Sequence, residues 1–185
     1  MKSFPHLHQP DKMDCGATCL AMVAKHYGKT YSIQKLRELC SATRSGVSML
    51  GISDAAEKLG FKTVGVRINF RQLCEDVPLP CIVHWRQEHF VVVYDVQKAR
   101  KQKAESAKAG NNTSAFCILP SANKSKGFVK VADPAHGLIQ FTPTEFCNHW
   151  LSTKKDGEDE GIALLLEPTP AFYEQEDEKS DRAKL

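Results

Sequence analysis

The sequence predicts an α+β domain in which N-terminal helices pack on an antiparallel β-sheet. Two observations support this fold class: apolar residues recur at helical spacing up to Gly60, and after Gly60 they alternate or form β-branched runs. A group of helices followed by strands joined by short turns is typical of α+β proteins. The 185 residues are 42% hydrophobic and 25% charged, which allows one sizeable core and excludes wholesale disorder.

Three helices are expected before Gly60. The first follows Asp14, a residue that can cap a helix, and it ends at Gly28, which suits a helix C-terminus. The second begins after Ser32, and the third runs over about residues 48–59. The N-terminal third of the chain is therefore expected to be helical.

Six strands are expected after Gly60, because apolar residues there alternate or are β-branched. They are predicted over residues 61–70, 80–85, 89–96, 128–132, 138–141 and 162–166. Tight turns at 86–88 and 133–137 join neighbouring strands in this series. A short helix is expected from Thr142 to Trp150, because Glu145 follows Thr142 at the spacing of a capping box.

The chain divides into a domain at residues 1–168 and a charged tail at residues 169–185. The tail is flanked by proline and lacks a core pattern, so we interpret it as a linker that leads to a membrane domain outside this chain. Residues 97–127 are interpreted as a basic surface insertion, with a short strand at 115–119. If the insertion only extends a loop, Val96 and Phe128 should lie close enough for a short hairpin turn to join them.

Charge and hydropathy exclude several functional classes. Lysine and arginine number 25 against 22 acidic residues, and this net charge of +3 is too balanced for a protein that mainly binds nucleic acid. The longest apolar run, Cys19 to Ala24, has six residues, far short of the roughly 20 that span a bilayer. The N-terminus has no apolar signal segment, and the seven cysteines form an odd set without a CxxC pair. These features predict a soluble intracellular domain.

Cys15 is the cysteine whose surroundings suggest chemistry. It lies at the start of the first expected helix, where unpaired N–H groups and the helix dipole favour a thiolate, and Gly16 would let a substrate backbone come close. A nucleophilic cysteine also needs an imidazole and a group that orients it. His89 and Asp133, each at the end of an expected strand, can supply both. A metal site that includes Cys19 is disfavoured, because no second pair has the spacing of zinc ligands.

Four segments taken together resemble the C39 peptidase family. They are Gln9, Asp14-Cys15-Gly16-Ala17-Thr18-Cys19-Leu20, His89-Phe90-Val91-Val92-Val93, and Asp133-Pro134-Ala135 with Gly137. Members of this family are cysteine protease domains at the N-termini of bacterial ABC transporters that export bacteriocins and related peptides. The resemblance covers roughly residues 5–168 and is specific, because the motifs occur in order with Gln9 six residues before Cys15. One departure is the 44-residue separation of His89 from Asp133, for which the basic insertion accounts.

The resemblance implies a papain-like fold and a division of roles among four residues. Cys15 would be the nucleophile, His89 the general base and then the acid, and Asp133 the residue that orients His89. The side-chain amide of Gln9 and the backbone N–H of Cys15 would form the oxyanion hole. Family members cut precursor peptides after a Gly-Gly pair at the end of a leader. The leader binds as an amphipathic helix in a hydrophobic groove.

The same resemblance implies the partners and the location of the domain. The partners would be a precursor peptide whose helical leader ends in Gly-Gly, and the transmembrane and ATPase domains of the same transporter. The domain would lie at the cytoplasmic face of the membrane. It would need no metal and no cofactor of its own, because ATP would bind only in the separate ATPase domain.

Two other functions remain open. One is a domain of an export ATPase that docks the substrate without hydrolysing it, and the joint presence of Gln9, Cys15, His89 and Asp133 argues against it. The other is a stand-alone cytosolic thiol hydrolase or transferase. The charged tail argues against this second function, because such a tail suits a linker to a membrane segment.

Overall fold

The computed structural model describes residues 3–41, 43, 46–97, 127–155 and 157–175 of the chain. The helices are α1 (Cys15–His26), α2 (Ile33–Leu39), α3 (Met49–Lys58), α4 (Phe70–Glu75), α5 (Pro143–Trp150) and α6 (Pro170–Glu174), with a short 3₁₀-helix η1 (Lys12–Asp14) before α1. The strands are β1 (Phe61–Ile68), β2 (Cys81–Trp85), β3 (His89–Gln97), β4 (Phe128–Asp133), β5 (Gly137–Phe141), β6 (Thr153–Lys155) and β7 (Glu158–Pro168).

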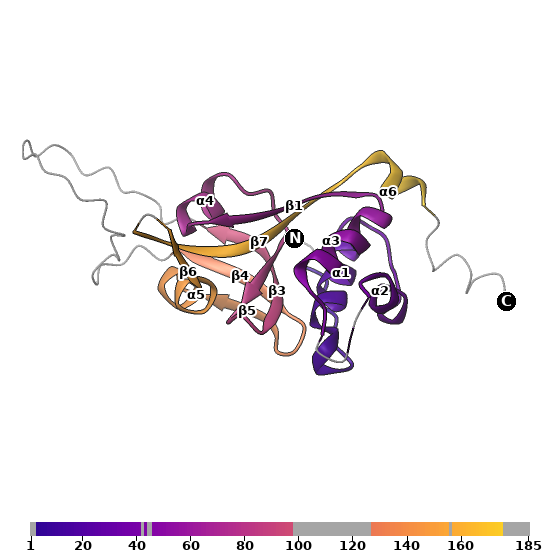
Figure 1. Ribbon diagram of the computed structural model, residues 1–185, viewed down its shortest axis with the longest axis horizontal. Coiled ribbons are helices and arrows are strands. Elements are labelled where there is room, and N and C mark those ends of the chain that lie inside the picture. Colours follow the sequence, from indigo (N-terminus) through magenta and orange to yellow (C-terminus); the bar gives the residue numbers. More distant parts are fainter. Residues whose placement is uncertain (1–2, 42, 44–45, 98–126, 156, 176–185) are drawn as a thin grey trace, which may run out of the picture.

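The strands form one antiparallel sheet in the order β1-β7-β2-β3-β4-β5, and β6 pairs with β7. Figure 1 shows α1, α2 and α3 gathered on one side of this sheet, while α5 lies on the opposite side. The α+β prediction is therefore confirmed. Within the described part of the chain, no helix is long and apolar enough to cross a membrane.

The sheet separates two apolar cores, because successive side chains of a strand point to opposite faces. On β3, Phe90 and Val92 belong to the core shared with α1, α2 and α3. Val91 and Val93 belong to the other core, where Phe146 and Trp150 of α5 are fully buried. The sheet is thus covered on both faces, and β3 is fixed firmly between the two cores.

Local capping explains where most helices begin. The Ser32 side chain accepts a hydrogen bond from the backbone N–H of Lys35, and Thr142 and Glu145 form the predicted capping box of α5. Asp14 precedes α1 as predicted, but it makes no capping bond. Its carboxylate instead accepts a bond of 2.6 Å from Nε of Arg37 on α2.

The described ends of the basic insertion lie side by side. Gln97 of β3 pairs with Phe128 of β4, and Val96 pairs with Val129. The prediction that a short hairpin turn could join Val96 to Phe128 is therefore confirmed. The predicted strand at 115–119, like the rest of residues 98–126, lies outside the described residues.

The chain continues into the core beyond residue 168, where the sequence places the end of the domain. Phe172 on α6 is fully buried, and its ring centroid lies 4.4 Å from that of Phe61 and 6.4 Å from that of Tyr27. The backbone N–H and the hydroxyl of Thr169 both donate to the carbonyl of Gly60. Gly60 has a φ of +89°, and a Cβ there would collide with the backbone of Phe172. The folded domain therefore includes α6, and residues 176–185 of the predicted tail lie outside the described residues.

Candidate active site

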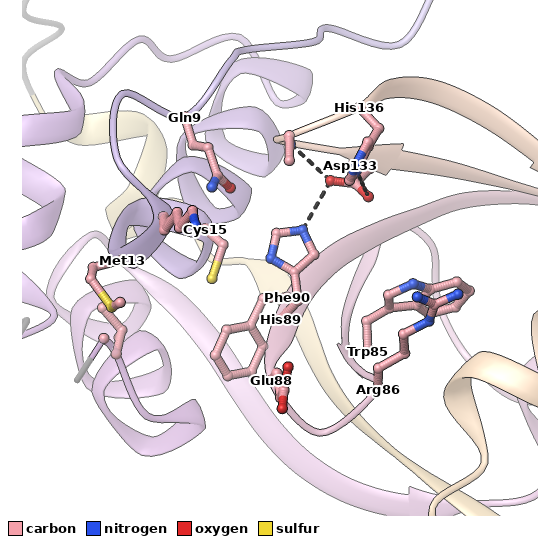
Figure 2. Close-up of a pocket in the computed structure, with 14 residues that line it drawn as sticks. Gln9, Met13, Cys15, Trp85, Arg86, Glu88, His89, Phe90, Asp133 and His136 are labelled. Atoms are coloured by element: carbon pink, nitrogen blue, oxygen red, sulfur yellow. Dashed lines mark hydrogen bonds and ion pairs between the residues drawn. The ribbon is translucent and has the colours of Figure 1, made fainter.

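A cleft of about 500 Å³ opens between the helical side of the molecule and the sheet (Figure 2). Its lining comes from residues within four segments: 9–15, 46–47, 85–90 and 133–136. The four residues predicted from the sequence all line this cleft, namely Gln9, Cys15, His89 and Asp133. Residues 124 positions apart in the chain are thus brought to one place by the fold.

Cys15 is the first residue of α1 and is only 6% exposed. The chain enters α1 directly from η1, and the Asp14–Arg37 ion pair ties this entry to α2. Gly16 does not face the cleft, contrary to the expectation that it admits a substrate backbone. A Cβ on Gly16 would lie 2.7 Å from Cδ1 of Ile52, so this glycine allows α1 to approach α3 closely.

His89 begins β3, directly after the turn that joins β2 to β3. Its Nε2 lies 2.9 Å from Oδ1 of Asp133, and an ionised carboxylate only accepts, so Nε2 carries a proton. Figure 2 shows the other ring nitrogen directed toward the sulfur of Cys15. Burial disfavours the charged ring, but interactions with Asp133 and Cys15 outweigh it and raise the pKa of His89 to about 9. The ring is therefore protonated at neutral pH.

Asp133 ends β4, and its side chain is 8% exposed. Oδ1 accepts from His89 and from the backbone N–H of Ala135 at 2.8 Å, while Oδ2 lies 2.9 Å from Nδ1 of His136. Burial alone would raise the pKa of Asp133, but these hydrogen bonds hold that pKa well below its usual range. The carboxylate therefore stays ionised and can fix the orientation of His89.

Gln9 lies in the extended segment before η1. Its backbone N–H donates to the carbonyl of Pro134 at 2.9 Å, which ties this segment to the turn between β4 and β5. Its side-chain amide points toward the space beside Cys15 (Figure 2). The amide oxygen is buried and has no hydrogen-bond partner among the described residues. The same amide carries two N–H donors, so it can meet an oxyanion at this place.

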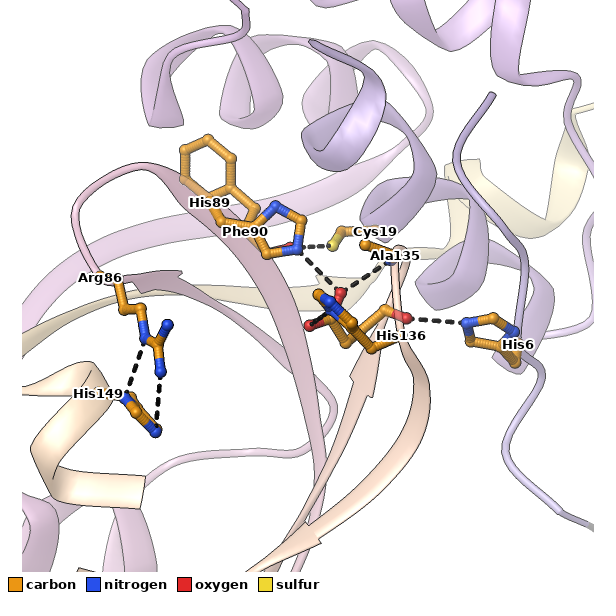
Figure 3. A network of polar contacts seen from close by, with 9 residues as sticks. His6, Cys19, Arg86, His89, Phe90, Ala135, His136 and His149 are labelled. Atoms are coloured by element: carbon orange, nitrogen blue, oxygen red, sulfur yellow. Dashed lines mark hydrogen bonds and ion pairs between the residues drawn. The ribbon is translucent and has the colours of Figure 1, made fainter. Parts of the chain in front are cut away.

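Cys19 lies one helical turn behind Cys15 and is fully buried. Its thiol donates to the backbone carbonyl of Phe90 at 3.2 Å (Figure 3), which joins α1 to β3 beside His89. Burial, together with the charges of Cys15 and Asp133, raises the pKa of the Cys19 thiol well above its usual value. Cys19 is thus core beneath the proposed nucleophile, as the sequence suggests.

The cleft lining also includes residues that were not predicted as site residues from the sequence, among them Trp85, Arg86 and His136. Arg86 donates from Nε to Nδ1 of His149 at 3.0 Å (Figure 3), and the ring of His149 packs against Trp85. These contacts join segments far apart in the chain, and no local pattern signals them. His136 does have a local signal, because it follows Asp133 by three residues in a tight turn and can fold back onto that carboxylate.

Residues 3–115 match the Peptidase C39 family. The chain is 34% identical over 181 residues to the lactococcin-G-processing and transport ATP-binding protein of Lactococcus lactis, with 95% of this chain and 20% of that protein covered. It is 35% identical over 185 residues to the mesentericin-Y105 transport/processing ATP-binding protein of Leuconostoc mesenteroides, with coverages of 96% and 20%. The chain thus spans about a fifth of the length of these curated relatives.

Two solved structures share the fold. One is a double glycine motif protease from an AMS/PCAT transporter in complex with the leader peptide, with a TM-score of 0.64, 26% identity, and 90% of this chain and 93% of that chain covered. The other is the peptidase domain of Streptococcus ComA, a bi-functional ABC transporter, with a TM-score of 0.63, 29% identity, and coverages of 90% and 100%. The predicted papain-like fold is confirmed, and the chain belongs to the Peptidase C39 family of cysteine peptidases.

Proposed function

We propose that this peptidase removes leader peptides from bacteriocin-like precursors by cutting after a Gly-Gly motif. The observation that carries the proposal is the meeting of Gln9, Cys15, His89 and Asp133 in one cleft. The substrate class is supported by the similar protease that bears the double glycine name and binds a leader peptide.

In the proposed reaction, Cys15 and His89 work as a pair. The raised pKa of His89 supports a resting state in which an imidazolium faces the sulfur of Cys15, so a proton donor is ready before attack rather than after it. The sulfur attacks the carbonyl carbon of the second glycine, and His89 gives its Nδ1 proton to the leaving amine as the C–N bond breaks. Neutral His89 then takes a proton from water, which hydrolyses the thioester and restores the thiolate–imidazolium pair.

The developing oxyanion needs hydrogen-bond donors that are in place before the reaction. We assign this role to the side-chain amide of Gln9 and the backbone N–H of Cys15. A single donor of this kind typically lowers the barrier by about 3 kcal/mol. The bond from the Gln9 backbone to Pro134 supports the assignment, because it fixes the segment that carries the amide.

The leader is expected to bind on the side of Cys15 that faces away from His89. His89 protonates the leaving amine, so the residues after the scissile bond must lie near His89 and the leader on the opposite flank. Figure 2 places Met13 on that flank, and Val47 also lines the cleft. Met13 is 37% exposed. This apolar surface suits apolar leader residues at helical spacing.

We further propose that the domain works within a peptide exporter, at the cytoplasmic face of the membrane. The relatives named as transport and processing ATP-binding proteins support this, and the chain corresponds to about a fifth of their length. The partners would be the transmembrane and ATPase domains of the same transporter. ATP would bind in the ATPase domain, so the peptidase step itself is expected to need no cofactor.

The test is cleavage of synthetic precursor peptides whose amphipathic leaders end in Gly-Gly, read by mass spectrometry. The wild-type chain should cut directly after the second glycine, and Cys15→Ala should abolish cleavage while the leader still binds. A peptide with Ala in place of either glycine should be cut poorly.

Two results would contradict the proposal. Leader binding without cleavage by the wild type would indicate a docking domain, and efficient cleavage after a bulky residue would indicate a different substrate class. A limiting dose of a thiol reagent gives an independent check, because it should modify Cys15 before the other cysteines.

A further inference from the structure

We propose that His136 is a positioning residue, which holds the second carboxylate oxygen of Asp133 so that the first oxygen stays directed at His89. The inference rests on the proposed function, because it adds a part to the same catalytic arrangement.

The carboxylate of Asp133 is held at both oxygens (Figure 2). Oδ1 accepts from His89 and from Ala135, and Oδ2 meets Nδ1 of His136 at 2.9 Å. The terminal torsion of an aspartate is broad, so one oxygen alone fixes the carboxylate plane poorly. The bond to His136 supplies the second point that the plane needs.

His136 is placed for this task by the turn between β4 and β5. Asp133 pairs with Gly137 across the turn, and Gly137 has a φ of +102°, which lets the chain reverse and bring His136 over the carboxylate. The His136 side chain is 71% exposed, whereas that of Asp133 is 8% exposed. A side chain so exposed adds little to the core, and its hydrogen bond is to the buried carboxylate of the proposed triad.

The donors around Asp133 assign the proton on His136. The titratable groups that face Asp133 are His89 on β3, His136 on its own turn, Cys19 on α1 and His6 in the N-terminal segment, and Cys15 faces His89. An ionised carboxylate only accepts, so His136 must present Nδ1–H. This bond is among those that hold the pKa of Asp133 low.

Two substitutions separate positioning from substrate contact. His136→Phe keeps a ring but removes the donor, and His136→Asn keeps a donor but removes the ring. The probe is a synthetic peptide with an amphipathic leader ending in Gly-Gly, and kcat and KM are measured between about pH 6 and 10. His136→Phe should lower kcat about 3–10-fold with KM unchanged, because a carboxylate that has lost one of its hydrogen bonds orients His89 less well. It should also move the alkaline limb to lower pH, because a rotated Asp133 stabilises the imidazolium less. His136→Asn should recover most of both losses.

Other outcomes would overturn the inference. A rise in KM with kcat unchanged would indicate that His136 contacts the substrate. Equal losses of kcat in His136→Phe and His136→Asn would show that the hydrogen-bond donor has no role. NMR titration of His89 in a Cys15→Ala background gives a readout that needs no turnover. There, adding His136→Phe should lower the pKa of His89, and an unchanged titration would reject the positioning role. The proposed function has a separate test: it fails if the Cys15→Ala variant still cleaves the peptide, whatever the His136 variants do.

Discussion

On the sheet side of the cleft, His89 and Asp133 are joined directly by a hydrogen bond of 2.9 Å, whereas on the helical side Cys15 is placed by packing. Gly16 lets α1 approach Ile52 of α3, and the Asp14–Arg37 pair fixes the entry to α1. Cys15 and the His89–Asp133 pair are therefore positioned by different kinds of interaction. Polar bonds within the sheet align imidazole and carboxylate, while packing of α1, together with the bond from Cys19 to the Phe90 carbonyl, sets the distance from sulfur to imidazole.

Gln9 crosses between the two sides, and its removal should have the largest effect after the loss of the Cys15 sulfur itself. Its side chain approaches Cys15, but its backbone is bonded to Pro134 on the sheet side. Gln9→Ala should lower kcat by roughly 10²–10³ with little change in leader affinity, because the donor matters most as the oxyanion forms. Steady-state kinetics and leader titrations measure the two quantities. A rise in KM with kcat unchanged would make Gln9 a substrate-binding residue instead.

Asp133→Asn should act on the sheet side alone. The pKa of His89 is raised to about 9, so the imidazolium is present below that pH and is lost as the pH rises through it. Without the carboxylate, the pKa of His89 should fall toward its ordinary value of about 6.5, and the alkaline limb of kcat/KM should move with it. At pH 8 this alone should cost roughly tenfold or more. An alkaline limb that stays near pH 9 in the variant would show that Asp133 does not control His89.

Substitutions at two glycines test whether the position of Cys15 and the stability of the fold can be changed independently. A Cβ on Gly16 meets the end of the Ile52 side chain, and the gain in helix propensity of about 1 kcal/mol offsets part of that strain. Gly16→Ala should therefore change the free energy of unfolding little but lower kcat several-fold by shifting Cys15. A Cβ on Gly161 overlaps the indole of Trp150, so Gly161→Ala should cost about 1–3 kcal/mol. Thermal unfolding and steady-state kinetics of both variants measure these effects. Equal losses of kcat in the two variants would show that Gly16 has no special role in placing Cys15.

Replacement of residues 98–126 by a short turn should have the smallest effect. Gln97 and Phe128 are already paired, so the turn closes an existing hairpin at small entropic cost. The unfolding temperature and the cleavage of a minimal peptide should stay nearly unchanged. If the basic residues also hold an acidic leader, the shortened chain should lose affinity for the full leader, and this difference should shrink as salt rises. A variant that fails to fold would show instead that the segment belongs to the core.

The fold class could be predicted from the sequence because it rests on local signals, and the four residues predicted for the site do line one cleft. Helical spacing, β-branched runs and the capping box at Thr142 each act within a few residues. The helix α4 could also have been found, since Asn69 and Gln72 form a capping box of the same kind.

The remaining features depend on contacts between distant segments. Asp14 has the residue type of a helix cap, but Arg37 on α2 takes its carboxylate. Gly16 follows Cys15 in the sequence, yet it serves the packing of α1 on α3 rather than the cleft. Neither outcome can be read from neighbouring residues, because each is decided by a helix that packs nearby only in the folded chain.

The burial of Phe172 decides how the domain behaves in concentrated solution. A chain that ended at Pro168 would leave the rings of Phe61 and Tyr27 uncovered on the surface. A contiguous aromatic patch of this kind favours self-association, and the strand β1 that begins at Phe61 is an edge of the sheet. Solubility of the peptidase therefore depends on a short helix far from its chemistry, and a version that keeps α6 should resist aggregation better than one cut before it.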